Sequence, residues 1–195
     1  MTVLQDVKKA IEIEAAAVKA LAENVGPEFE EAIKLIQNCT GKVIVTGVGK
    51  SGHVGKKIAA SLASTGTPAF FVHSTEGVHG DLGMIEEKDV VIMISNSGET
   101  AEVLNLLPSL SVIKPKKIAI TKNADSSMAK ACDVALTYKY ETEADHLGLA
   151  PTTSSTLALV IGDALAVGLC KAQGFTKENF HLYHPGGSLG KQLSR

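Results

Sequence analysis

The chain contains no tryptophan, and aromatic residues make up only 4% of its 195 residues. Proteins that bind single-stranded nucleic acid use aromatic side chains for base stacking, so this mode of binding is disfavoured. The formal net charge of −2 provides no basic field for nucleic acid or for an anionic membrane surface. We therefore expect no nucleic-acid partner, and an anionic ligand would have to be held by local groups.

Cysteine is also scarce, since Cys39, Cys132 and Cys170 are the only three and form no CxxC pair. Widely spaced cysteines in odd number favour a reducing compartment, and each is best explained as a small core residue. The N-terminus lacks the charged and then apolar segments of a signal peptide. No uninterrupted apolar run approaches the roughly 20 residues of a membrane span, because Asp163 interrupts the best candidate, residues 157–169. We expect a cytoplasmic protein without a membrane segment.

Hydrophobic spacing predicts two helices followed by alternating strands and helices. The first helix covers residues 3–23, and Pro27 suits the first turn of a second helix that runs to about residue 37. Short apolar runs predict five strands, at residues 42–46, 69–72, 90–94, 117–120 and 134–137. Further helical patterns cover residues 54–64, 100–110, 153–172 and 177–180.

Short strands separated by helices are typical of βαβ units and of a parallel sheet covered on both faces. The pattern predicts an α/β, three-layer, flavodoxin-like domain with a five-stranded parallel sheet in the order 2-1-3-4-5. Residues 1–195 form a single domain, in which residues 1–40 are an N-terminal helical arm and residues 41–195 are the α/β core and C-terminal tail. Residues 139–151 are too long for a simple connection, and such loops are often functional.

Two polar loops that contain glycine follow the first and third predicted strands. They are residues 47–52 (GVGKSG) and 95–100 (SNSGET), and each leads into a helix whose first N–H groups are available to an anion. The hydroxyl groups of the second loop suit the oxygens of a phosphate, although a serine-rich helix cap would look the same. Because strands 1 and 3 flank the switch point of a 2-1-3-4-5 sheet, both loops should lie at one binding site. The sequence therefore predicts a phosphate site.

Nucleotide sites fit the first loop less well. It matches GxGxxG, but a dinucleotide site also requires an acidic residue at the end of the second strand, where His73 and Ser74 stand instead. A Walker A loop requires glycine at the position of Ile44. A nucleotide-dependent oxidoreductase is therefore disfavoured.

The two loops together resemble those of the SIS (sugar isomerase) domain family. Further stretches are similar to the arabinose-5-phosphate isomerases of that family, namely residues 64–73, 79–84, 147–152, 162–166 and 184–190. The resemblance runs from about residue 10 to the C-terminus. Two departures stand out, since many relatives continue into a pair of CBS domains where this chain stops, and some carry Glu-Ala-Cys-Pro at residues 143–146. We expect that the chain either was cut after Arg195 or is a form with a single domain.

The resemblance implies an aldose–ketose isomerase that interconverts D-ribulose 5-phosphate and D-arabinose 5-phosphate, the first step toward the lipopolysaccharide sugar Kdo. It also implies a homotetramer whose sites are shared between subunits. Two alternatives stay open, namely an isomerase of another sugar phosphate and a regulatory module that binds a phosphosugar without catalysis. Enediol chemistry requires no cofactor, and no third ligand adjoins His181 and His184, so we expect neither cofactor nor metal.

The resemblance assigns the site residues. Phosphate binding falls to Ser51, Ser95, Ser97 and Thr100. The catalytic candidates are Lys50, Glu102, Glu143, His184 and His79. Lys50 would stabilise charge on the enediolate oxygen, Glu102 and Glu143 are rival bases, and His184 would pass protons between oxygens or assist ring opening. Asp163, within an apolar helix, is expected to contact a neighbouring helix.

Overall fold

The sheet has the predicted strands and strand order. The computed structural model describes residues 2–186. The strands are β1 (Val43–Gly47), β2 (Ala69–His73), β3 (Val90–Ile94), β4 (Lys116–Thr121) and β5 (Val134–Thr137). They pair in parallel in the order β2-β1-β3-β4-β5, which confirms the predicted topology. Each strand begins and ends within one residue of its predicted range.

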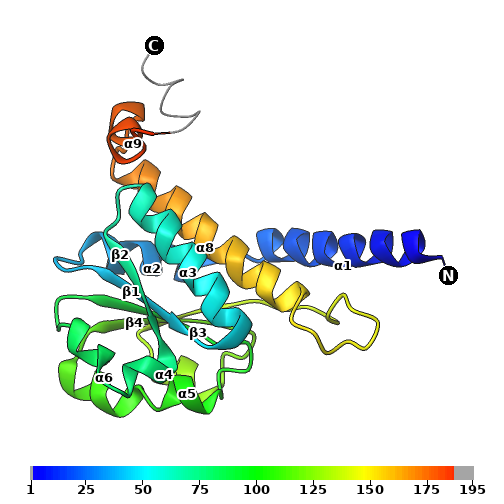
Figure 1. Cartoon of the computed structure of the whole chain (residues 1–195), viewed down its shortest axis with the longest axis horizontal. Helices are drawn as coiled ribbons and strands as arrows, with labels where there is room; N and C mark the ends of the chain where they lie inside the picture. Colours follow the sequence, from blue (N-terminus) through cyan, green and yellow to red (C-terminus); the bar gives the residue numbers. More distant parts are fainter. Residues whose placement is uncertain (1, 187–195) are drawn as a thin grey trace.

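Helices cover both faces of the sheet (Figure 1). The longer helices are α1 (Val3–Glu23), α2 (Pro27–Gln37), α3 (Gly49–Ser64) and α8 (Thr153–Ala172). The shorter ones are α4 (Ser74–Gly77), α5 (Ala101–Leu104), α6 (Leu107–Ile113), α7 (Ser127–Lys130) and α9 (Lys177–Tyr183), with a 3-10 turn, η1 (Asp81–Met84). One core lies between the sheet and α1, α2, α3 and α8, and a second lies between the sheet and α5, α6 and α7. The three-layer prediction is confirmed.

The two central strands supply both cores. Val45 and Ile92 face the first core, whereas Ile44 and Met93 face the second. Every residue of β1 and β3 is buried. Strands covered on both faces need no polar side, and this is why β3 is a continuous apolar run and β1 has a single polar side chain, Thr46, whose hydroxyl bonds to that of Ser74.

The helix predicted over residues 100–110 is wrong in one respect, because the structure divides it into α5 and α6. Pro108 lies in the first turn of α6. Proline has no N–H to donate to the carbonyl four residues earlier, and its ring crowds that carbonyl, so an uninterrupted helix would be strained there. The chain changes direction at this break. Helix α5 is therefore only one helical turn long and stays beside the loop that follows β3.

The predicted start of α3, at residue 54, is also wrong, because the helix begins at Gly49. Glycines in this stretch hide the helical pattern because they add no apolar side chain. The structure shows why side chains are absent: a Cβ at Gly52 would lie 3.1 Å from the carbonyl oxygen of Gly47, and one at Gly55 would lie 2.9 Å from the ring of Phe71. The glycines let α3 pack directly against β1 and β2.

The N-terminal half of α1 projects from the rest of the protein (Figure 1). Ala17 and Leu21 near its C-terminal end are buried, whereas Val3 and Leu4 are 78% and 80% exposed. The predicted helical arm is therefore confirmed for α1. Its outer half carries an apolar surface that nothing else in the described residues covers.

By length and composition alone, α8 would qualify as a membrane span, with a mean hydropathy of 1.6. Its buried residues, however, pack against α3, the sheet and the two N-terminal helices. Asp163 forms an ion pair with Lys57 of α3, so the expected contact with a neighbouring helix is confirmed. These contacts are those of a core helix.

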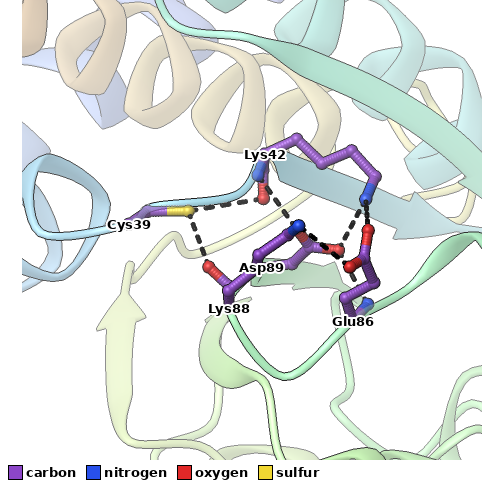
Figure 2. A network of polar contacts seen from close by, with 5 residues as sticks. All are labelled: Cys39, Lys42, Glu86, Lys88 and Asp89. Carbon is purple, nitrogen blue, oxygen red and sulfur yellow. Dashed lines mark hydrogen bonds and ion pairs between the residues drawn. The ribbon is translucent and has the colours of Figure 1, made fainter.

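A buried carboxylate joins the segments that lead into β1 and β3 (Figure 2). Asp89 pairs with the Lys42 ammonium at 2.8 Å and accepts hydrogen bonds from the backbone N–H groups of Lys42 and Glu86, at 2.9 and 2.8 Å. The Cys39 thiol donates to the carbonyl of Lys88 at 3.3 Å. This network lies at the amino ends of the strands, opposite the edge where the polar loops lie.

Candidate functional site

A cavity of about 270 Å³ lies at the carboxyl edge of the sheet, beside the ends of β1 and β3. Lys50 and Ser51 line it from the first turn of α3, and Ser97 and Thr100 line it from the loop after β3. The first turn of α8 forms a further wall. This is the switch point at which open α/β sheets bind ligands. The structure therefore brings the two predicted phosphate loops together.

The first loop offers free backbone donors. Gly49 adopts a φ of +58°, a conformation that glycine adopts without strain, and this lets the chain turn sharply from β1 into α3. Val48 is the N-cap of α3 and makes no side-chain capping hydrogen bond. The N–H groups of the first turn are therefore open to an anion, which the helix dipole also favours.

The second loop is shaped by its own hydroxyl groups. Ser95 is buried, its Oγ accepts a hydrogen bond from the Gly98 N–H at 3.0 Å, and it lies 2.7 Å from the Thr100 Oγ1. The Ser97 Oγ accepts from the Glu99 N–H at 3.1 Å. Ser97 and Thr100 line the cavity, whereas Ser95 lies beneath the loop and does not. Three of the four predicted phosphate residues thus face the cavity, and Ser95 fixes the loop's shape.

The catalytic candidates are more scattered. Lys50 is exposed and lines the cavity. Glu102 lies in the first turn of α5, as predicted, but it is exposed and is not part of the cavity wall. His79 is exposed on the turn between α4 and η1, and it too lies outside the wall. Within one chain, Lys50 is the candidate that reaches the cavity directly.

Glu143 is buried and bonded to the start of α8. Its Oε2 accepts hydrogen bonds from the Thr152 N–H at 2.9 Å, the Ser154 N–H at 3.1 Å and the Thr152 hydroxyl at 3.2 Å. Burial raises the pKa of the Glu143 carboxyl, but hydrogen bonds from Ser154, Thr152 and Tyr140 outweigh it and hold the pKa below its ordinary value. The run of hydroxyl residues from 152 to 156 predicts that one of these side chains caps the N-terminus of α8. In the structure Thr152 is the N-cap residue but makes no side-chain capping bond, and the carboxylate of Glu143 accepts the hydrogen bonds there instead.

His184 lies far from the cavity. It follows α9, which lies at the C-terminal end of α8 (Figure 1). The cavity is lined from the first turn of α8, at the other end, and the 20 residues of this helix span about 30 Å. The His184 ring stacks on Phe180 with centroids 3.9 Å apart, and its Nδ1 lies 2.9 Å from the Phe180 carbonyl oxygen. His184 cannot reach the cavity of its own chain. Residues 187–190 of the motif that it begins lie outside the described residues.

Sequence reasoning missed three polar residues at the site. The Tyr138 hydroxyl donates to the Asn96 Oδ1 at 3.1 Å, and the Asn96 Nδ2 donates to the Tyr140 hydroxyl at 2.9 Å. Asn96 and Tyr138 line the cavity. Asn96 stands within the loop after β3, where the hydroxyl groups carry the stronger sequence signal. Tyr138 directly follows β5, so the rule that ligands bind at the carboxyl ends of strands could have identified it.

Cys39 and Cys132 are partly buried against the two cores, whereas Cys170 is partly exposed and packs against neither, so the expectation of a core position fails for Cys170. All three are unpaired, and burial raises the pKa of the Cys132 thiol to about 12, so this thiol is not activated as a nucleophile. Within residues 2–186, no group of three or more metal-ligating His, Cys, Asp or Glu side chains is found.

Comparison with known proteins agrees with this geometry. A family model described as SIS domain matches residues 35–168. The chain is 54% identical over 186 residues to the arabinose 5-phosphate isomerase KdsD of Salmonella typhi and 50% identical over 190 residues to that of Pseudomonas aeruginosa. These alignments cover 95% and 97% of this chain but 57% and 58% of the relatives, so the chain spans little more than half of their length.

One solved structure is similar over its full length. The c3406 protein of E. coli CFT073, determined in complex with arabinose 5-phosphate, superposes on 95% of this chain and 100% of its own with a TM-score of 0.91 and 49% identity. The fold that carries the cavity is therefore shared with a ligand-bound relative.

Proposed function

This chain belongs to the SIS domain family, and from that premise we propose that it interconverts D-arabinose 5-phosphate and D-ribulose 5-phosphate. The observation that carries the proposal is the cavity at the switch point, where phosphate donors from two loops lie beside Lys50. Its relatives are named for this substrate, and one solved relative holds arabinose 5-phosphate. The product would feed synthesis of the lipopolysaccharide sugar Kdo. We assign the reaction to the cytoplasm, in keeping with the unpaired cysteines.

The phosphate would bind to the open N-terminus of α3 and to the hydroxyl groups that line the cavity. Ser51, Ser97 and Thr100 can each donate one hydrogen bond to a phosphate oxygen. Ser95 would contribute by holding the loop in the shape that presents Ser97 and Thr100. Fixing the phosphate at one end orients the sugar carbons at the other, which is the main requirement for a positioned proton transfer.

The chemistry needs a base, a proton relay and stabilisation of one anionic oxygen. A base removes the proton from C2 of the aldose, the C1 oxygen gains a proton, and an enediol results. The base then returns its proton to C1 while the C2 oxygen loses its own, and the ketose forms. Lys50 would stabilise the enediolate oxygen, and Glu102 would act as the base. No cofactor or metal is required for these steps.

We propose that the functional unit is a homotetramer with shared sites. The exposed apolar side chains of α1, which include Val3, Leu4, Val7 and Ile11, suit burial against another copy. His184 lies beyond the far end of α8, a helix whose 20 residues span about 30 Å, so any role in catalysis requires a neighbouring subunit to supply it. A symmetric assembly would bring His184 of one copy to the cavity of the next.

The direct test is to mix the protein with arabinose 5-phosphate and to follow the appearance of ribulose 5-phosphate. We expect turnover by the wild-type chain, and in Glu102→Gln a turnover rate lowered by about 100-fold or more, on the order expected for a missing base. The binding of arabinose 5-phosphate to Glu102→Gln, measured by calorimetry, should stay within about threefold of wild type, because glutamine keeps the size of the side chain and removes only its ability to accept the proton.

The second candidate function is a module that binds a phosphosugar without catalysis. It is favoured by the position of the catalytic candidates, of which Lys50 alone lines the cavity within the described part of one chain. If the wild-type chain binds arabinose 5-phosphate as a stable oligomer but shows no turnover, this candidate replaces the isomerase.

A further inference from the structure

The contacts of Glu143 are those of an anchor and not of a reacting group. Its side chain is buried and does not line the cavity. Both N–H groups bonded to it, those of Thr152 and Ser154, belong to the start of α8, where a negative charge is stabilised by the helix dipole. A carboxylate held in this way is a weak proton acceptor, because hydrogen bonds stabilise its ionised form.

The segment that carries Glu143 is also hydrogen-bonded to Asn96, which lines the cavity from the loop after β3. Tyr140, three residues earlier, accepts a hydrogen bond from the Asn96 amide at 2.9 Å. Tyr138 donates to the other end of the same amide at 3.1 Å. The amide of Asn96 is therefore fixed at both of its polar atoms, while one N–H and one lone pair remain for a ligand in the cavity.

We propose that Glu143 is a positioning residue that binds the first turn of α8 to segment 140–143, so that Asn96 and Ser154 face the sugar from fixed places. Asn96 lies on the wall after β3, and Ser154 lies on the wall formed by α8. Glu143 bonds directly to the Ser154 N–H, and Tyr140 bonds directly to Asn96. The ligand class is the hydroxyl-bearing chain of a phosphorylated sugar, and the inference rests on the function proposed above.

A consequence concerns where the phosphate binds. The start of α8 already has an anion, since Glu143 occupies the Thr152 and Ser154 N–H groups. The start of α3 has no side-chain cap within the described residues. The phosphate is therefore directed to the α3 side of the cavity, and the sugar hydroxyls are directed toward Asn96 and Ser154.

The test compares Glu143→Gln and Tyr140→Phe with Glu141→Gln, an exposed residue of the same loop that does not line this cavity. In both test variants we expect the KM and the calorimetric Kd for arabinose 5-phosphate to rise about 5- to 10-fold while kcat stays within about threefold of wild type. Tyr140→Phe removes the acceptor of the Asn96 amide, and Glu143→Gln removes the charge that strengthens the bonds to Thr152 and Ser154. The acid limb of the kcat–pH profile should be unchanged. Glu141→Gln should behave as wild type.

The double variant tests whether the two residues act together. Because Glu143 and Tyr140 belong to one network, the double variant should raise KM no more than the worse single variant does. Should Glu143→Gln fail to fold, Tyr140→Phe decides alone, since it removes a single oxygen atom from the same network.

Two results would overturn the inference. Turnover that falls by about 100-fold or more in Glu143→Gln, together with loss of the acid limb, would identify Glu143 as the base. A lower melting temperature with unchanged KM and Kd would reduce Glu143 to a helix cap. Absence of turnover by the wild-type chain would contradict the proposed function only, because the Kd for arabinose 5-phosphate still reports on Asn96 and Ser154.

Discussion

At the scale of single residues, Gly98 shows how packing and backbone shape together constrain the loop after β3. It adopts a φ of +70°, and a Cβ at this position would overlap the side chain of Ser126. Its N–H also donates to the Ser95 Oγ, which in turn lies against Thr100. A change at Gly98 should therefore move two groups of the predicted phosphate site.

We expect Gly98→Ala to weaken phosphate binding by at least about tenfold and to lower the free energy of unfolding by about 2 kcal/mol, because both strain and a clash are introduced. Calorimetry with inorganic phosphate and urea unfolding would measure the two effects. Gly174→Ala is the matched control, since Gly174 also has a positive φ, of +64°, but its Cβ would meet no other atom within 4 Å. It should lose stability while phosphate binding stays unchanged, and weakened binding in this control would contradict the prediction.

The sequence predicts that a residue lies at the site when the residue belongs to a short motif that directly follows a strand. Ser51, Ser97 and Thr100 belong to strings that directly follow a strand, and the structure brings them to one cavity. Glu143 differs, because its partners Thr152 and Ser154 lie 9 and 11 residues further along the chain. Hydrogen bonds across an irregular loop have no period in the sequence, and a helix N-terminus can be capped by any acidic residue that the loop returns to it.

At the scale of elements, α3 and α8 present their N-termini to the same cavity in different states. The first is open and the second is occupied by a carboxylate. The sequence predicts both helices by their apolar spacing, but it misplaces the start of α3 and misses the break at Pro108. In each case the cause is a residue with unusual backbone properties, which carries structural information without contributing to hydrophobic periodicity.

The network around Asp89 yields a prediction about how strands β1 and β3 are held at their amino ends. Burial raises the pKa of the Asp89 carboxyl, but the bonds from Lys42 and from the backbone of Glu86 and Lys42 outweigh it, so the pKa is lowered. A lowered pKa means that the stabilisation is complete above the unfolded value of about 4 and is lost as the pH falls toward the folded value.

We therefore expect Asp89→Asn to lower the free energy of unfolding by about 3 kcal/mol at pH 7, since it leaves Lys42 without its buried partner. The difference from wild type should stay constant from pH 8 to about 5 and shrink below about pH 4. Urea unfolding at several pH values measures it. Glu86→Gln is the control, because Glu86 is 56% exposed and its surface pairs should contribute little to stability. An equal loss for Asp89→Asn at pH 3 and pH 7 would show that the charge is not the cause.

At the scale of the whole molecule, the two ends of α8 separate groups that the family resemblance assigns to one site. Lys50 lies at the cavity, which the first turn of α8 also lines. His184 follows α9, which lies beyond the other end of α8 (Figure 1). A motif in the sequence can indicate that both residues act in catalysis, but it does not indicate which copy of the chain supplies them. Which copy supplies each residue depends on how the copies assemble, and this cannot be read from the sequence of one chain.

We expect inactive Lys50→Ala and His184→Ala chains to restore activity to each other when they are unfolded together, refolded and allowed to assemble. If each site draws the two residues from different subunits, about a quarter of the sites in an equal mixture will contain both. Turnover of arabinose 5-phosphate and light scattering measure the activity and the assembly state. A mixture of Lys50→Ala with Glu102→Gln should gain nothing, since both residues would belong to the same chain at each site. Absence of rescue in the first mixture would contradict a site to which a neighbouring subunit supplies His184.

The Asp89 network and the Glu143 network lie at opposite edges of one sheet. The first holds the strands together where they begin, and the second shapes the cavity where they end. Changes in the loops at the carboxyl edge can therefore alter the cavity while the bonds that keep the sheet folded stay intact. Such a division makes the domain readily evolvable, because a new specificity need not weaken the framework that supports it.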